Sequence, residues 1–214
     1  FSTCTGAQNT VSIIATTEDN TLSYSWFKNG NAIANEVTSQ LIFNTIATTD
    51  AGTYKAVVTN GCGLSTTSNN FVVVVKEKVS LNGTIANKQL CAGNSLAIDI
   101  SSFLNGADIN TTYQWRLNNI DLTEVSAKTN SLSLLNITKS KEGAYSVITN
   151  NSCGASTLAL FNASINTAPE ITTQPIVGLV CEGATFTNNV IANNSLQLPL
   201  SYQWYKDGNS ITNN

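Results

Sequence analysis

The sequence predicts an all-β protein made of β-sandwiches that follow one another along the chain. The first observation behind this prediction is a repeat with a period of about 90 residues. The tryptophans Trp26, Trp115 and Trp204 lie 89 residues apart, and the residues around each of them are similar. The other two observations are short apolar segments with strand-like alternation and the lack of a convincing helical apolar stripe.

The repeat divides the 214 residues into three parts. We expect residues 1–76 to be a first sandwich without its opening strand, because three residues precede Cys4 whereas a longer extended segment precedes its counterpart Cys91. Residues 77–167 are expected to be a complete second sandwich. Residues 168–214 correspond to the N-terminal half of a third. Because almost no linker residues separate the repeats, we expect the sandwiches to be arranged end to end and to touch.

Strand composition marks the elements within each repeat. Residues 11–15 and 96–100 are rich in β-branched and apolar residues, and the second segment alternates apolar with polar side chains. Tyr24 and Trp26 lie two positions apart, so both side chains point to one face of a strand. Residues 60–63, Asn-Gly-Cys-Gly, suit a tight turn between two long strands. About seven short strands per repeat are typical of a β-sandwich.

Each repeat resembles an immunoglobulin-like domain. The repeated tryptophans match the buried Trp of strand C, and Asp50-Ala-Gly-Thr-Tyr54 matches the Asp-x-Gly-x-Tyr motif at the corner between strands E and F. The second repeat keeps the Gly and Tyr of this motif but has Lys141 at the Asp position, so any salt bridge of that Asp is expected to be missing there. The resemblance implies a structural core that includes Trp26, Trp115, Trp204, Tyr54 and Tyr145.

The cysteines depart from the antibody pattern of this fold. Ala56 and Val147 occupy the position two residues after the corner Tyr, where that pattern has its second Cys. This layout resembles the tandem immunoglobulin-like repeats of very large secreted surface proteins of Bacteroidota-type bacteria, including adhesins of gliding cells. The resemblance implies an extracellular, cell-surface location and a non-catalytic stalk or adhesive filament.

The immunoglobulin topology also bears on the disulfides. It places Cys4 at the end where the chain leaves the first sandwich and Cys153, in the turn between strands F and G, at the end where the chain enters the second. We therefore favour a Cys4–Cys153 disulfide between repeats, because about a strand length separates the two ends of one sandwich. Pairing within repeats, Cys4–Cys62 and Cys91–Cys153, is the alternative. Under the favoured scheme, the partners of three cysteines lie in neighbouring segments: Cys62, Cys91 and Cys181.

The residue inventory gives no support to catalysis, metal binding or a cofactor. The chain has no His, which removes the commonest general base and metal ligand. Its 13 carboxylates do not recur as a pair at equivalent positions of two repeats. The segment Glu18-Asp19-Asn20 has the oxygen atoms that a hard cation prefers, but we interpret it as a solvated loop. We therefore expect no catalytic residues, no metal site and no cofactor, and the chain is predicted not to be an enzyme.

The charge and hydropathy of the sequence limit the classes of partner that we expect the chain to bind. Only 11% of the residues are charged, the net charge is −3, and no basic block is present, which argues against nucleic acid. The longest apolar run, residues 71–75, is too short to insert directly into a membrane. The expected partners are neighbouring repeats of the same chain, with surface glycans or other cell-surface proteins as candidate ligands. The leading hypothesis is a structural, adhesive stalk. The alternative is an accessory spacer or carbohydrate-binding array in a large secreted enzyme.

Overall fold

The computed structural model describes residues 1–18, 21–194 and 197–212, and it is built of strands with a few short 3-10 helices. Its internal packing groups the chain into two compact units. Packing unit 1 contains residues 1–82 together with 103–113 and 148–158. Packing unit 2 contains residues 83–102, 114–147 and 159–214. No helix of the described residues is both long and apolar enough to span a bilayer.

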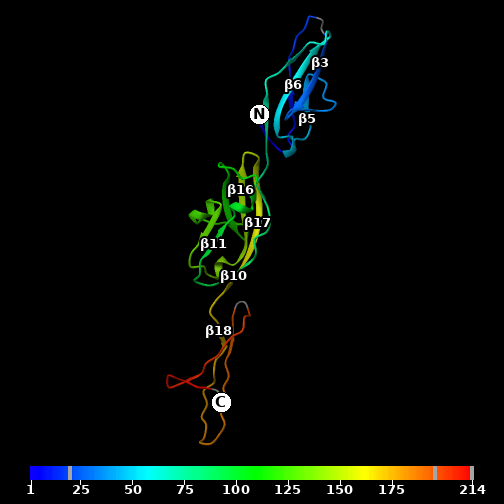
Figure 1. Cartoon of the computed structure of the whole chain (residues 1–214). Helices are drawn as coiled ribbons and strands as arrows, with labels where there is room; N and C mark the ends of the chain where they lie inside the picture. Colours follow the sequence, from blue (N-terminus) through cyan, green and yellow to red (C-terminus); the bar gives the residue numbers. More distant parts are fainter. Residues whose placement is uncertain (19–20, 195–196, 213–214) are drawn as a thin grey trace. The chain divides into compact units, whose positions relative to one another are not determined.

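The first repeat folds as two facing sheets (Figure 1). The larger sheet has the order β1-β8-β6-β3-β4, with β7 also paired to β6, and the smaller sheet pairs β2 with β5. The strands are β1 (Ser2–Cys4), β2 (Asn9–Ser12), β3 (Leu22–Lys28), β4 (Asn31–Ala32), β5 (Gln40–Phe43), β6 (Gly52–Asn60), β7 (Ser65–Thr67) and β8 (Phe71–Lys76).

Alternation along the strands builds the core between these sheets. In β6, Tyr54, Ala56 and Val58 point inward and are buried, while their neighbours are more exposed. Trp26 of β3 is fully buried, and its indole N–H donates to the carbonyl of Thr38 at 2.9 Å, so the only polar atom of the ring has a partner. Ala56 occupies the position predicted to replace a core cysteine, and it is fully buried.

The second repeat has the same strand order. Its larger sheet runs β10-β17-β16-β13-β14, and two smaller sheets pair β11 with β15 and β9 with β12. The strands are β9 (Ser80–Leu81), β10 (Lys88–Cys91), β11 (Leu96–Asp99), β12 (Leu104–Asn105), β13 (Thr112–Leu117), β14 (Ile120–Asp121), β15 (Ser131–Leu134), β16 (Gly143–Asn151) and β17 (Gly154–Asn166).

Both repeats contain a tyrosine corner. The hydroxyl of Tyr54 donates to the carbonyl of Asp50 at 2.7 Å, and the hydroxyl of Tyr145 donates to the carbonyl of Lys141 at 2.8 Å. The acceptor is a backbone atom, so the exchange of Asp for Lys at this position leaves the corner intact. The Lys141 ammonium instead forms an ion pair with Glu124 at 2.5 Å. An ion pair thus exists at this corner, with the charge of the motif position reversed.

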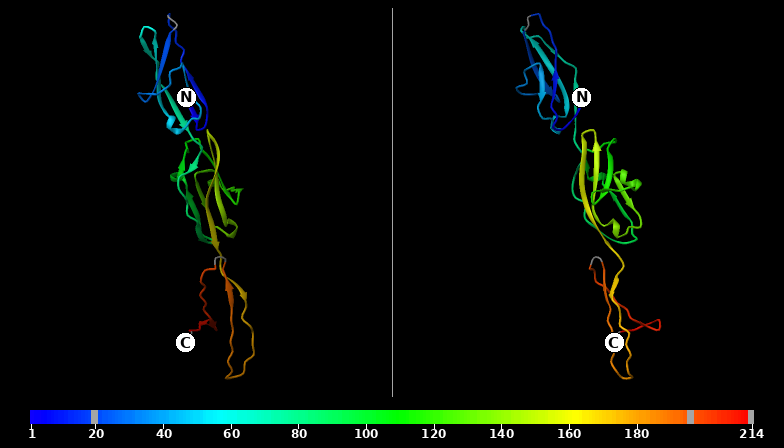
Figure 2. Two further views of the ribbon diagram at one scale, coloured as in Figure 1. Left: turned by 90° about the vertical axis from the view of Figure 1, so that its right-hand side faces the viewer. Right: turned by 180° about the vertical axis from the view of Figure 1, so that it is seen from behind.

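The third repeat has no facing sheet in the described residues, whereas each of the first two repeats has two facing layers of strands. Its described strands are β18 (Glu170–Thr173), β19 (Ile191–Asn193), β20 (Tyr205–Lys206) and β21 (Asn209–Ser210), which form two separate two-stranded sheets. Figure 2 shows this segment, orange to red, as extended chain with a few short strands and without a second layer. The prediction of a buried core position for Trp204 is wrong: its side chain is 39% exposed. The reason is that the described residues of this segment provide no facing sheet to cover the ring.

Candidate functional site at the Cys4–Cys153 disulfide

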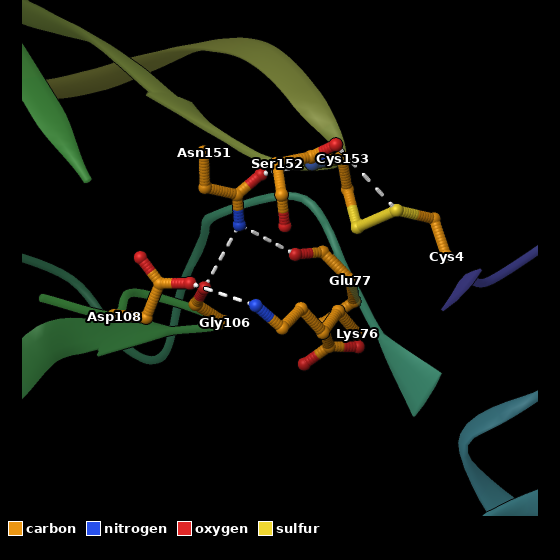
Figure 3. Close-up of a disulfide and its surroundings, with 8 residues drawn as sticks. All are labelled: Cys4, Lys76, Glu77, Gly106, Asp108, Asn151, Ser152 and Cys153. Carbon is orange, nitrogen blue, oxygen red and sulfur yellow. Dashed lines mark hydrogen bonds and ion pairs between the residues drawn. A yellow bond between two sulfur atoms is a disulfide. The ribbon is translucent and has the colours of Figure 1, made fainter. Parts of the chain in front are cut away.

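The structure brings together two of the five cysteines. Cys4 ends β1, Cys153 lies in the turn between β16 and β17, and their sulfur atoms are bonded at 2.00 Å (Figure 3). Their Cα atoms are 5.6 Å apart, within the range of an ordinary disulfide. The remaining cysteines are free and exposed in this structure: Cys62, Cys91 and Cys181.

Backbone pairing places Cys4 at the end of its sheet. The strand β1 runs parallel to β8, with Cys4 opposite Lys76, so both strands end on the same side. The N–H of Thr5 donates to the carbonyl of Lys76 at 2.8 Å, and that of Gly6 donates to the carbonyl of Ile46 at 2.7 Å. These bonds fix the backbone that directly follows Cys4, at the place where β8 leads into the second repeat.

The turn that carries Cys153 is held by one buried amide side chain. The oxygen Oδ1 of Asn151 accepts from the N–H of Cys153 at 2.9 Å. Its nitrogen Nδ2 donates to the carbonyls of Glu77 at 2.7 Å and Gly106 at 2.9 Å (Figure 3). Only 9% of Asn151 is exposed. A single side chain therefore shapes the turn and ties it to the segment that follows β8.

Close backbone packing surrounds this amide. Gly106 has a φ of +74°, and a Cβ atom on it would lie 2.9 Å from the carbonyl oxygen of Lys78. A side chain at this position would therefore be strained and would also push the 77–78 segment away. The Sγ of Cys4 lies 3.8 Å from the carbonyl oxygen of Ser152. This is a van der Waals contact, because a disulfide sulfur carries no proton to donate.

One ion pair lies beside the disulfide. The Nζ of Lys76 and Oδ2 of Asp108 are 3.3 Å apart, and both side chains are partly exposed. The backbone N–H of Asn110 is the main group that holds the pKa of Asp108 below its usual value, and Lys76 adds to this effect. Partly exposed ion pairs contribute little to stability. We therefore attribute the attachment of the Cys153 turn mainly to the disulfide and to the hydrogen bonds of Asn151.

The sequence reasoning did not identify Asn151 as a functional residue. A signal was present, because Asn60 and Asn151 both stand two residues before a Cys that is followed by Gly. Asn60 also shapes its turn: its Oδ1 accepts from the N–H groups of Cys62 at 3.1 Å and Leu64 at 2.9 Å. The pattern Asn-x-Cys-Gly therefore marks the turn that presents a cysteine.

Across the described residues, no group of three or more His, Cys, Asp or Glu side chains could hold a metal ion. Of the segment considered for a cation, Asp19 and Asn20 lie outside the described residues. A hollow of about 340 Å³ lies beside Trp204 and is lined by Ile171, Val190 and Tyr202 among others. Because the counterparts Trp26 and Trp115 are buried core residues, we interpret this hollow as uncovered core.

Comparison with known proteins identifies the fold. Residues 3–75 match the family model of the immunoglobulin domain. The first two repeats are immunoglobulin-like β-sandwiches. The predicted all-β fold class and the immunoglobulin resemblance are therefore confirmed. No curated protein matches the chain in sequence.

Solved structures of tandem immunoglobulin-like domains superpose on the whole chain or most of it. An I-band fragment of titin matches with a TM-score of 0.58 and 15% identity, covering 100% of this chain and 78% of the titin fragment. Immunoglobulin domains 1–4 of Sidekick-1 match with a TM-score of 0.52 and 21% identity, covering 99% of this chain and 59% of that one. The insect immune protein hemolin matches with a TM-score of 0.50 and 16% identity, covering 77% and 44%. Identities this low indicate a shared fold.

Proposed function

We propose that the chain is a structural and adhesive segment of a large, secreted, non-catalytic surface protein of a Bacteroidota-type bacterium. In this proposal the immunoglobulin-like repeats form an array outside the cell, and the Cys4–Cys153 disulfide fastens one repeat to the next. The observation that carries the proposal is this disulfide, which joins β1 of the first repeat to the β16–β17 turn of the second. Stable disulfides are typical of secreted and surface proteins.

Two further features support a mechanical role, and one comparison supports an adhesive role. Asn151 joins the turn to the Glu77 carbonyl, so the hold does not depend on sulfur alone. The strands β1 and β8 are parallel, and so are β10 and β17, which gives both repeats the same edge pairing. Hemolin, whose domain arrangement is linked with homophilic adhesion, shares the fold, and we extend an adhesive role to this array on that basis.

Single-molecule stretching of the 214-residue chain from its two ends tests the fastening. The disulfide shields the residues between positions 4 and 153, a sequence separation of 149, from the pulling force. At 3.3–3.6 Å per residue, the fully unfolded oxidised chain should be shorter than the reduced chain by about 500 Å. The Cys4→Ser variant should show the longer extension in both conditions, whereas Cys62→Ser should behave as the unmodified chain. Equal extension of the oxidised and reduced chains would refute the fastening.

Protease treatment of intact source cells tests the surface location. An extracellular array should lose this segment to added protease while cytoplasmic proteins stay intact. The sequence of the whole gene then separates the two function classes. Many further repeats would support the adhesin, and one catalytic domain in the same chain would favour the accessory array of a secreted enzyme.

A further inference from the structure

The end of the first repeat that carries the β6–β7 turn resembles the end of the second repeat that carries Cys153. A groove of about 210 Å³ lies between its β6–β7 turn and the segment after β2. Asn60 and Leu64 are among the residues that line it. Leu64 is 72% exposed beside it, and the thiol of Cys62 is exposed in the same turn. The turn thus presents a cysteine and apolar surface together.

In the second repeat, the corresponding place is filled by the chain itself. Glu77 and Lys78 lie against Gly106, and a Cβ atom on that glycine would come within 3.0 Å of both of their carbonyl oxygens. Val79, the next residue, is only 1% exposed. The Asn151 amide donates to the carbonyls of both Glu77 and Gly106. Residues 77–79 therefore fill the place in the second repeat that corresponds to the groove of the first repeat.

Asn60 is prepared for the same contact. Its Oδ1 atom accepts two turn N–H groups, as described above. Its Nδ2 group has no acceptor among the residues that the structure describes, whereas Nδ2 of Asn151 has two. An amide nitrogen at the edge of a groove matches the carbonyl of an extended backbone segment.

The structure also shows which kind of cysteine could form a disulfide with Cys62. Cys91 stands in the same backbone frame as Cys4: β10 pairs in parallel with β17, and the N–H of Ala92 donates to the carbonyl of Asn166 at 2.8 Å. The N–H of Gly93 donates to the carbonyl of Ile137 at 2.8 Å, as Gly6 does to Ile46. Cys91 is exposed and free. A repeat of this kind therefore offers a cysteine at one end that is suited to the turn cysteine at the other.

We propose that the groove beside Cys62 is the docking surface for a preceding immunoglobulin-like repeat. The segment that follows that repeat fills the groove and offers a backbone carbonyl to Asn60, and a cysteine at the end of its β1-type strand bonds to Cys62. The bond forms when two thiols lose two electrons and two protons to a disulfide oxidant, which is reduced to two thiols. This inference rests on the proposed function and names the partner of the array at this end.

An extended version of the full chain tests the docking surface. A second copy of residues 77–166, followed by residues 77–87, is joined directly to Phe1, and Cys153 of the added copy is replaced by Ser. This design places a Cys91 ahead of the first repeat in the order in which Cys4 precedes the second. After refolding with oxidised glutathione, non-reducing peptide mapping should join Cys62 to the added Cys91. Alkylation of Cys62 should be almost completely lost, and it should stay unchanged when the added Cys91 is replaced by Ser.

A shorter extension tests the groove without the disulfide. Residues 77–87 alone, joined to Phe1, should raise the melting temperature of the first repeat, and the Val79→Asp substitution within the added segment should cancel this rise. If the longer protein fails to fold, this change in melting temperature alone tests whether residues 77–87 bind the groove. A reactive Cys62 beside an intact Cys4–Cys153 bond, or a short extension without effect, would refute the docking surface and leave the proposed function standing. Loss of both disulfides would count against the two proposals together.

Discussion

The turn after β6 and the turn after β16 have the same design but different surroundings. Asn60 and Asn151 each accept the N–H of the cysteine two residues on. Cys153 is bonded and Asn151 is nearly buried, whereas Cys62 is free and Asn60 keeps an amide nitrogen without an acceptor in the described chain. The comparison shows that the local motif builds the turn, while covalent closure depends on what packs against it.

The largest expected effect compares the tryptophans of a closed repeat and an open one. Trp115 is fully buried, whereas Trp204 is 39% exposed. Trp115→Ala should lower the free energy of unfolding by about 3–5 kcal/mol, as large core truncations do. Trp204→Ala should cost less than about 1 kcal/mol, because much less packing is lost. Denaturant unfolding of both variants measures this difference. A cost under about 1 kcal/mol for Trp115→Ala would show that it does not hold the core.

The two turn asparagines should differ by less. Asn151→Ala removes one accepted and two donated hydrogen bonds, and it leaves the carbonyls of Glu77 and Gly106 without this partner. We expect a cost of about 1–3 kcal/mol. Asn60→Ala removes two accepted bonds in an exposed turn and should cost about 1 kcal/mol or less. Calorimetry of both variants checks the order, and equal costs would argue against a special hold by Asn151.

A smaller difference lies in the strands before these turns. Thr149 stands where the first repeat has Val58, and both side chains are buried. The Thr149 hydroxyl has no hydrogen-bond partner in the described structure. Thr149→Val should therefore stabilise the second repeat by about 1 kcal/mol, because an unpaired polar group leaves the core. Val58→Thr is the matched reverse change and should destabilise the first repeat. A stabilising effect of Val58→Thr would contradict this account.

The smallest effect is confined to alkaline pH. Burial, aided by the charge of Glu124, raises the pKa of Tyr145 from 10.0 to about 12. Because the folded state holds this proton more tightly than the unfolded state, the stability that it contributes is complete below about pH 10 and declines as the pH rises toward 12. Absorbance titration of the phenolate should show a late step that Tyr145→Phe removes. Ionisation of Tyr145 near pH 10 would contradict the burial argument.

Much of the fold was predictable because it depends on residues close in sequence or on a clear period. The recurrence of Trp26 and Trp115 indicated the core, and the Gly and Tyr of the corner motif indicated the turn before strand F. The exposure of Trp204 was not predictable from the residues around it, because burial of this ring depends on strands that must pack over it from elsewhere. The role of Asn151 depends on carbonyls at Glu77 and Gly106, and backbone acceptors leave no trace in the side-chain pattern. The repeat boundaries remain a prediction.

The bond between Cys4 and Cys153 also affects what happens when a protease cuts the backbone. A cut in the backbone anywhere between these residues leaves two pieces that are still joined by sulfur. If Cys91 makes the same bond with the next repeat, as the proposal for Cys62 implies, the two enclosed segments overlap from residue 91 to residue 153. Every junction would then be bridged twice, by the peptide chain and by a crosslink. The array would separate into two pieces only after a protease had cut the backbone and a reductant had opened the disulfide.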